Sequence, residues 1–144
     1  GYERPSLEAR IESHGASDWI RLAGRVSDEE LLSLYRRAWL VASSSVAEGW
    51  GMTLTEAAAC GTPAVATDIA GHRDSVADGR SGVLCASRRA MVAELTSLLT
   101  DRQRLATLQQ GALDHAATLT WTATAFGTFS PLAADALRRN RSRR

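Results

Sequence analysis

The chain has 144 residues, which is enough for one domain with its own hydrophobic core. Hydrophobic residues make up 44% of the sequence, which fits a folded globular protein and excludes a disordered one. The 17 basic residues, all of them arginines, nearly balance the 16 acidic ones, so the net charge of +1 excludes a charge-driven nucleic-acid binder. Two cysteines are too few for a disulfide framework. The sequence also lacks a run of about 18 apolar residues, which a membrane-spanning helix would need.

The arginines are unevenly distributed. The part of the chain before the last seven residues carries 12 basic and 16 acidic groups, a net charge of −4. The start of the chain shows no signal-peptide pattern and no Met, which suggests a cytoplasmic protein and a segment of something longer. We expect a solvated tail or a weak peripheral contact with the inner face of a membrane through the clustered arginines. These are Arg138, Arg139, Arg141, Arg143 and Arg144.

The first quarter of the chain predicts two helices and a strand. Apolar spacing favours a helix over Ser6 to His14, ended by Gly15. Trp19 to Leu22 predicts a short strand. Ser27 and Glu30 form a capping-box pattern that starts the second helix. The apolar residues that fall on one face of this helix are Leu31, Leu34, Tyr35 and Ala38.

The middle of the chain alternates strands and helices. Trp39 to Ala42 is a continuous apolar run, as expected of a strand buried on both faces. Three serines follow it, and a helix is predicted over Met52 to Cys60, with Gly61 as its C-cap and Pro63 preventing its continuation. Further short strands are predicted at Ala64 to Thr67 and Val83 to Cys85. Between them we expect a loop over Asp68 to Asp74 and a turn over Asp78 to Gly82.

Beyond Ser87 the chain reads as helical. Leu-rich faces predict two helices, and Ser130-Pro131 resembles the cap and first-turn proline of a third. Strands that alternate with helices predict parallel βαβ units, so the fold class is α/β, with a Rossmann-like parallel sheet covered by helices on both faces. We expect the two cysteines, Cys60 and Cys85, to be small buried residues.

Two loops follow strands, where an open parallel sheet binds its ligands. In the first, Gly49 and Gly51 open directly onto a helix, whose free amides and positive dipole end suit a phosphate. Glu48 precedes these glycines, and Glu56 lies eight positions later, where a carboxylate can accept hydrogen bonds from ribose hydroxyls. Each feature alone is weak, since a glycine turn occurs in many folds and a helical glutamate is usually solvated.

The whole string from Glu48 to Asp68 is much more specific. Its Glu-x7-Glu spacing, with an aromatic-Gly pair inside and Gly-Thr-Pro-Ala-Val after it, resembles the retaining GT-B glycosyltransferases of family 4, the "group 1" type. The segments Leu22 to Leu31, Gly71 to Asp74 and Asp78 to Gly82 also resemble this family, so the likeness covers residues 1–121. It implies a partial nucleotide-sugar-binding lobe over 1–121, and a C-terminal helix with the Arg-rich tail over 122–144.

The resemblance also implies a role for each matching residue. Glu48 takes the catalytic position against the transferred sugar, and Glu56 binds the ribose hydroxyls. The base is bordered by Arg25 and Val26. A donor-sugar role for the loop at Gly71 and His72 is implied as well, although a lone loop histidine is more often structural. The residues that face the pyrophosphate and the donor sugar are Gly49, Trp50, Gly51, Met52 and Thr53.

The donor implied is a nucleotide sugar, such as a UDP- or GDP-sugar, and the reaction retains the anomeric configuration without a metal or cofactor. The strands of this chain resemble the third to sixth of the family's C-terminal lobe, whose first two βα units carry a Gly-Arg turn and a lysine. Because this sequence lacks those two units, has no lysine and lacks the acceptor-binding lobe, we expect the chain alone to be inactive and to bind donor weakly. It would need the missing N-terminal lobe or a complementing chain.

Two other functions remain open from the sequence. One is a non-catalytic nucleotide-sugar-binding or regulatory subunit that works with a partner chain. The other is a different GT-B enzyme, such as a sugar epimerase, which the Glu-x7-Glu spacing disfavours. The sugar, the base and the acceptor are not specified by these residues.

Overall fold

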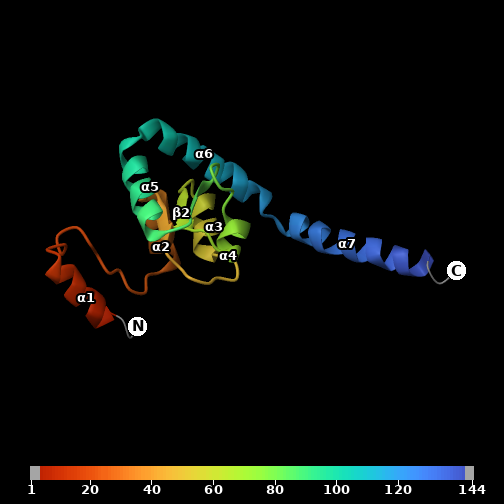
Figure 1. Cartoon of the computed structure of the whole chain (residues 1–144), viewed down its shortest axis with the longest axis horizontal. Helices are drawn as coiled ribbons and strands as arrows, with labels where there is room; N and C mark the ends of the chain where they lie inside the picture. Colours follow the sequence, from red (N-terminus) through yellow and green to blue (C-terminus); the bar gives the residue numbers. More distant parts are fainter. Residues whose placement is uncertain (1–3, 142–144) are drawn as a thin grey trace. The chain divides into compact units, whose positions relative to one another are not determined.

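The computed structural model describes residues 4–141 (Figure 1). The chain divides into two compact units, Gly1–Leu31 and Leu32–Arg144, which are described separately. The predicted boundary between residues 121 and 122 stays a prediction. The expected α/β class is confirmed in the second unit, which holds a parallel sheet with helices on both sides.

The first unit contains α1 (Arg4–Ser13), where a helix was predicted. The predicted strand at Trp19 to Leu22 is wrong, because this segment has no strand structure. The Ile20 amide donates to the Ala16 carbonyl in a turn at 2.9 Å, and Trp19 is 76% exposed. A strand exists only where a neighbour pairs with its backbone, and no described segment pairs with this one.

The capped helix is confirmed as α2 (Asp28–Arg37). The Glu30 amide donates to Ser27 Oγ at 3.2 Å, which is the first half of the predicted capping box. The four residues predicted to share one face are all half-buried. The sequence therefore specified the start of this helix and the side on which it packs.

The sheet has three parallel strands in the order β1-β2-β3. These are β1 (Val41–Ser43), β2 (Ala64–Thr67) and β3 (Gly82–Cys85). Val41 pairs with Ala64, and Ala64 with Gly82, so the three strands end at the same edge of the sheet. Four strands were expected from the family resemblance. The one predicted at Trp19 to Leu22 is not found, so the described residues 4–141 hold three.

The first strand differs from its prediction in burial. Trp39 to Ala42 was expected to be buried on both faces, but Ala42 is exposed and Val41 is half-buried. The reason is that β1 lies at an edge and has β2 on one side only. By contrast, β2 has a strand on each side, and its first three residues are buried.

Each face of β2 has its own core of buried side chains. Figure 1 shows the strand among the helices that cover it. Val65 points to the side of α5 (Arg88–Thr100) and α6 (Arg102–Thr118), where Leu98 and Leu108 are buried. Ala64 and Ala66 point to the opposite side and pack with Leu54 of α3 (Met52–Ala59). This alternation along one strand is the period-2 rule for a sheet covered on both faces. Cys85 is buried as expected, whereas Cys60 is only half-buried.

Two predictions about loops and helix ends are wrong. The expected loop at Asp68 to Asp74 contains the short helix α4 (Ala70–Ser75), whose first turn is closed by the Arg73 amide on the Ile69 carbonyl at 2.9 Å. Pro131 does not start a helix but lies inside α7 (Trp121–Arg141). That helix begins ten residues earlier, where Thr120 Oγ1 accepts from the Ala123 amide at 3.1 Å.

The predicted arginine tail is only partly described. Arg138 and Arg139 both pair with Asp135, at 3.6 and 2.7 Å. Arg143, Arg144 and the side chain of Arg141 lie outside the described residues, and a membrane contact stays a prediction. Among residues 4–141, no helix combines the length and the apolar character that crossing a membrane requires.

Candidate functional site

The site lies at the edge where the parallel strands end. The loop of residues 44–51 follows β1 there, and α4 follows β2 after two residues. This is the position at which an open α/β sheet places its ligand. The structure therefore brings together the two loops that the sequence singled out.

Gly51 joins the first loop to α3. Its φ of 80° and ψ of 54° are left-handed, a conformation that glycine adopts without strain, and no side chain caps the helix at this position. The Leu54 amide donates to the Gly51 carbonyl at 3.0 Å, so the amides of Met52 and Thr53 precede the first hydrogen bond of the helix. Both residues are exposed. The helix start thus offers uncapped donors and the positive dipole end to an anion.

The predicted pair Gly71 and His72 packs directly against the Glu48 loop. A Cβ at Gly71 would lie 2.4 Å from the Glu48 carbonyl oxygen and 3.0 Å from the Gly49 carbonyl carbon. The backbone of α4 and the backbone of the loop therefore touch, which only glycine permits. His72 is fully buried beside this contact, so its side chain is not on the surface that a ligand meets.

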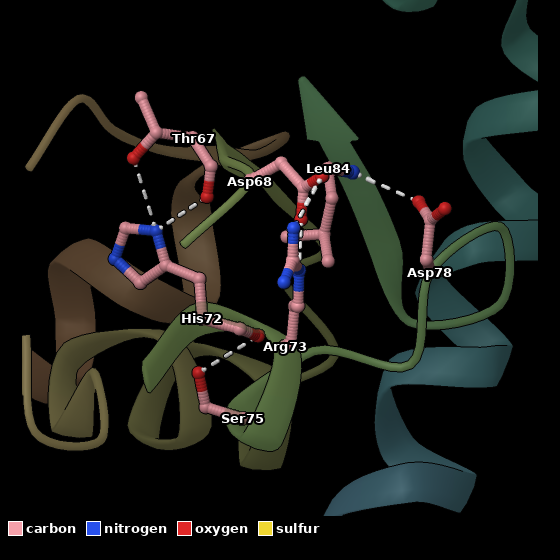
Figure 2. Close-up of polar contacts among 7 residues, drawn as sticks. All are labelled: Thr67, Asp68, His72, Arg73, Ser75, Asp78 and Leu84. Atoms are coloured by element: carbon pink, nitrogen blue, oxygen red, sulfur yellow. Dashed lines mark hydrogen bonds and ion pairs between the residues drawn. The ribbon is translucent and has the colours of Figure 1, made fainter. Parts of the chain in front are cut away.

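Figure 2 shows how His72 is held. Its Nδ1 lies 2.8 Å from the Thr67 carbonyl oxygen and 3.2 Å from Thr67 Oγ1. Its backbone carbonyl lies 3.4 Å from Ser75 Oγ, which also donates to the Gly71 carbonyl at 3.0 Å. These bonds fix α4 against the end of β2.

Glu48 is connected to the same cluster through serines. Ser45 Oγ donates to Glu48 Oε1 at 2.8 Å, and the Ser45 carbonyl accepts from Thr67 Oγ1 at 2.6 Å. Ser43 Oγ lies 3.4 Å from Ser45 Oγ and 3.3 Å from His72 Nε2. The exposed Glu48 carboxylate is thus held in a defined direction although it stands on a loop.

Glu56 is held from α2. Tyr35 Oη donates to Glu56 Oε2 at 3.1 Å, and the Tyr35 carbonyl accepts from Thr62 Oγ1 at 2.6 Å. Burial raises the pKa of Tyr35 to about 12, and the neighbouring Glu56 carboxylate adds to the effect. The tyrosine therefore stays protonated and donating at neutral pH.

A hollow of about 610 Å³ adjoins the exposed face of α3. One wall carries three of the predicted donor-binding residues, Trp50, Met52 and Glu56, and the other comes from the end of α6 and the start of α7. Most of its lining is apolar, with the Glu56 carboxylate as a charged group. The remaining lining residues are Thr55, Ala59, Ala116, Leu119, Thr120, Trp121 and Thr124.

An ion pair stabilises the outer side of α4. Arg73 Nε and Nη2 donate to the two carboxylate oxygens of Asp68, at 2.6 and 3.1 Å (Figure 2). This guanidinium lowers the pKa of Asp68 below its ordinary value. Nearby, Asp78 Oδ1 accepts from the Leu84 amide at 2.8 Å and so ties the turn before β3 to that strand. Burial raises the pKa of the Cys85 thiol, with Glu94 and Asp78 adding to the shift, so Cys85 is an unreactive core residue.

Two predicted residues lie in the other compact unit. Arg25 is exposed and Val26 half-buried in the segment that leads into α2, and their contact with the base stays a prediction. No cluster of three or more potential metal ligands occurs in the described part of the chain. The roles assigned to Glu48, Gly49, Thr53 and the other donor-binding residues are likewise predictions that the fold accommodates.

Sequence reasoning missed four residues that hold the two glutamates. Ser43, Ser45 and Thr67 are the hydroxyl residues at the ends of β1 and β2, and Tyr35 was expected only as a core residue of α2. A usable signal existed for the first three, because hydroxyl residues at the ends of adjacent parallel strands must lie close together. Nothing in the sequence placed Tyr35 beside Glu56, which is 21 residues away.

Comparison with known proteins agrees with this architecture. The family described as "Glycosyl transferases group 1" matches residues 1–114. The chain is 41% identical over 128 residues to the D-inositol 3-phosphate glycosyltransferase of Thermobispora bispora, covering 87% of this chain and 30% of that protein. It thus spans about 30% of the length of the curated relative it matches.

Solved structures share the fold at 24% sequence identity. Sucrose-phosphate synthase from Thermosynechococcus elongatus matches with a TM-score of 0.76 over 94% of this chain and 35% of its own. Alr3699/HepE of Anabaena, solved in complex with UDP and glucose, matches with a TM-score of 0.75 over 91% of this chain and 36% of its own. The sheet and its helices correspond to the Rossmann-like C-terminal lobe of GT-B enzymes. With a family match over residues 1–114 and a relative 41% identical, the chain belongs to the glycosyl transferases group 1 family.

Proposed function

We propose that this chain is the donor-binding part of a retaining glycosyltransferase, which transfers a sugar from a nucleotide sugar to an acceptor. The observation that carries the proposal is the pair of hydrogen-bonded glutamates beside the uncapped start of α3. Glu48 accepts from Ser45 Oγ at 2.8 Å and Glu56 from Tyr35 Oη at 3.1 Å, and both are exposed. Each carboxylate is oriented by the protein and still open to a ligand.

The three parts of a nucleotide sugar match the three features of this edge. The diphosphate takes the amides of Met52 and Thr53, where a helix start favours negative charge. The ribose hydroxyls donate to Glu56, and the sugar hydroxyls donate to Glu48. The apolar hollow with Trp50 on one wall adjoins Glu56 and gives the nucleoside a flat surface to pack on.

In the proposed reaction the acceptor hydroxyl attacks the anomeric carbon from the face that the diphosphate leaves. The new glycosidic C–O bond forms as the bond from carbon to the leaving phosphate oxygen breaks, and the acceptor proton passes to the departing diphosphate. The amides at the α3 start stabilise the charge that develops on that leaving group. No step assigned to these residues uses a metal.

Ligand-observed NMR with UDP-glucose and GDP-mannose tests donor binding by the 144-residue chain. We expect a dissociation constant above the micromolar range. Glu56→Gln should raise it at least about tenfold, because a hydrogen bond to a charged group is lost. The control is Asp114→Asn, which removes an exposed carboxylate of α6 that bonds only to Gln110 within the described chain. Equal binding by wild type and Glu56→Gln would contradict the assignment.

Turnover separates the enzyme from the alternative of a non-catalytic subunit. In a protein that also carries the acceptor lobe, Glu56→Ala should chiefly weaken donor binding and Glu48→Ala should chiefly lower kcat. Donor binding without sugar transfer, once that lobe or a partner chain is present, would favour the regulatory subunit instead.

A further inference from the structure

The buried histidine of α4 is an ionisable side chain beside the site whose role the donor contacts do not explain. His72 is fully buried, whereas Glu48, Met52 and Thr53 around it are exposed. We propose that His72 is a positioning residue for Glu48, acting through Ser43 and Ser45 and not by touching the donor. The inference rests on the proposed function only in that Glu48 is taken to face the transferred sugar.

The orientation of the imidazole ring is fixed at one nitrogen. Nδ1 lies 2.8 Å from the Thr67 carbonyl oxygen, and a carbonyl can only accept, so Nδ1 carries a hydrogen. A flipped ring would place a carbon against this buried carbonyl and leave it without a donor. Nε2 therefore points to the opposite side, where Ser43 Oγ lies at 3.3 Å.

From Ser43 the contacts continue to the carboxylate. In the neutral ring with its hydrogen on Nδ1, Nε2 accepts from Ser43 Oγ, so the 3.4 Å approach of Ser43 Oγ to Ser45 Oγ is a packing contact, and Ser45 Oγ donates its own hydrogen to Glu48 Oε1 at 2.8 Å. A second connection runs from Thr67 Oγ1 to the Ser45 carbonyl at 2.6 Å, so both the backbone and the side chain of Ser45 are held. The chain of polar contacts therefore joins a buried ring to an exposed carboxylate.

Glu48 needs this support because of its location. It stands on an irregular loop and is exposed, so neither helical backbone nor packing fixes its side-chain direction. A carboxylate that must meet particular hydroxyls gains from being held before the ligand arrives, since the ordering cost is then not part of binding. The same α4 segment also packs on this loop through Gly71. His72 thus stands where the loop is already held and extends that support to the carboxylate.

The first experiment reads the ring itself. The chain contains three histidines, so a long-range ¹H–¹⁵N spectrum of the ¹⁵N-histidine-labelled protein shows three ring systems, and His72→Gln identifies that of His72. We expect Nδ1 to carry a hydrogen and the Nε2 resonance to move most in Ser43→Ala, then in Ser45→Ala, then in Glu48→Gln. The control is Ser44→Ala, an exposed neighbouring serine outside the chain of contacts.

The second experiment measures what the sugar adds to binding, as the ratio of the UDP and UDP-glucose dissociation constants. Loss of one supporting hydrogen bond should reduce this ratio about fivefold in Ser43→Ala, Ser45→Ala and His72→Gln, with UDP affinity unchanged. Ser45→Thr, which keeps the hydroxyl, should have the wild-type ratio, and so should Ser44→Ala. A role limited to folding would instead weaken UDP and UDP-glucose equally.

Each result decides the proposal. An Nε2 resonance that is the same in Ser45→Ala and Glu48→Gln as in Ser44→Ala overturns it, whether or not a donor binds. A moved resonance with an unchanged UDP-glucose ratio also overturns it, because the connection would then not position Glu48 for a sugar. If neither UDP nor UDP-glucose binds the wild-type chain, the donor-binding proposal fails, and the NMR comparison alone decides the connection to Glu48. If His72→Gln does not fold, the serine variants carry the test, because they leave the buried ring in place.

Discussion

The two glutamates of the site are held in different ways. Glu48 lies on a loop and is tied by Ser45 to a cluster that ends in the buried ring of His72. Glu56 lies on α3 and receives one hydrogen bond, from a half-buried tyrosine of α2. The two carboxylates therefore differ in how many side chains from other elements are needed to hold them.

The backbone explains this difference. A helix fixes the direction of a side chain through its own hydrogen bonds, so a residue on α3 needs little further support. A loop residue has no such framework and depends on side-chain hydrogen bonds from neighbouring elements. We therefore expect substitutions on the α4 side of the site to disturb more than substitutions around Glu56.

The largest effect is expected where α4 touches the Glu48 loop. Gly71→Ala puts a Cβ 2.4 Å from the Glu48 carbonyl, so one backbone must move, and the free energy of unfolding should fall by about 3 kcal/mol. Gly49→Ala is the matched control, because a Cβ there meets nothing within 4 Å. Urea unfolding of both variants makes the comparison, and equal stabilities would show that the two backbones are not in direct contact.

A smaller effect is expected at the end of β2. Thr67→Val removes the hydroxyl that donates to the Ser45 carbonyl at 2.6 Å, and the unfolding free energy should fall by about 1–2 kcal/mol because a part-buried acceptor loses its partner. Thr107→Val on α6 makes the same change at an exposed site, and it should stay within about 0.5 kcal/mol of wild type. Thermal and urea unfolding measure both. If the two variants lose the same amount, Thr67 does not hold the loop.

Titration of Tyr35 tests the hydrogen bond that holds Glu56. Tyr35 has a pKa of about 12 against an ordinary 10.0, so its protonated form is favoured in the folded state. The associated stability is present below pH 10 and is lost as the pH rises towards 12. Absorbance of tyrosinate in a Tyr2→Phe background measures this pKa, since the chain has only two tyrosines.

Glu56→Gln separates the two causes of that shift. Removing the carboxylate should lower the pKa of Tyr35, while burial keeps it above 10.0 because burial is the larger cause. A Tyr35 pKa that is the same in Glu56→Gln as in the wild type would mean that the contact with Glu56 does not form in solution.

The smallest effect is expected at the exposed ion pair of α4. In Arg73→Gln the pKa of Asp68 should return towards its ordinary value, and stability at neutral pH should change little because the pair is solvent-screened. The sign follows from the lowered pKa of Asp68. The stabilisation is present above the ordinary value and is lost as pH falls through the folded-state value. Carboxyl-detected NMR titration measures the shift, and an unchanged Asp68 pKa would show that the ion pair is absent in solution.

The sequence by itself determined the local architecture. Caps and breakers at Ser27, Gly51, Gly61 and Pro63 set the ends of α2 and α3, and the apolar run of β2 set its strand, because these signals act over a few residues. The family was also evident from the Glu-x7-Glu string, which the match over residues 1–114 confirms.

The tertiary structure decided what depends on neighbours. Residues 19–22 form no strand because none of the described segments pairs with them, and β1 is half-exposed because it has β2 on one side only. The Asp68 loop became α4, closed by contacts with Thr67 and the Glu48 loop. Likewise Tyr35 meets Glu56, and Ser43 meets His72, only once distant segments are packed together. Hydrogen bonds between residues 21 to 29 positions apart leave no periodic trace in a sequence, so only the folded chain shows which side chains hold the two glutamates.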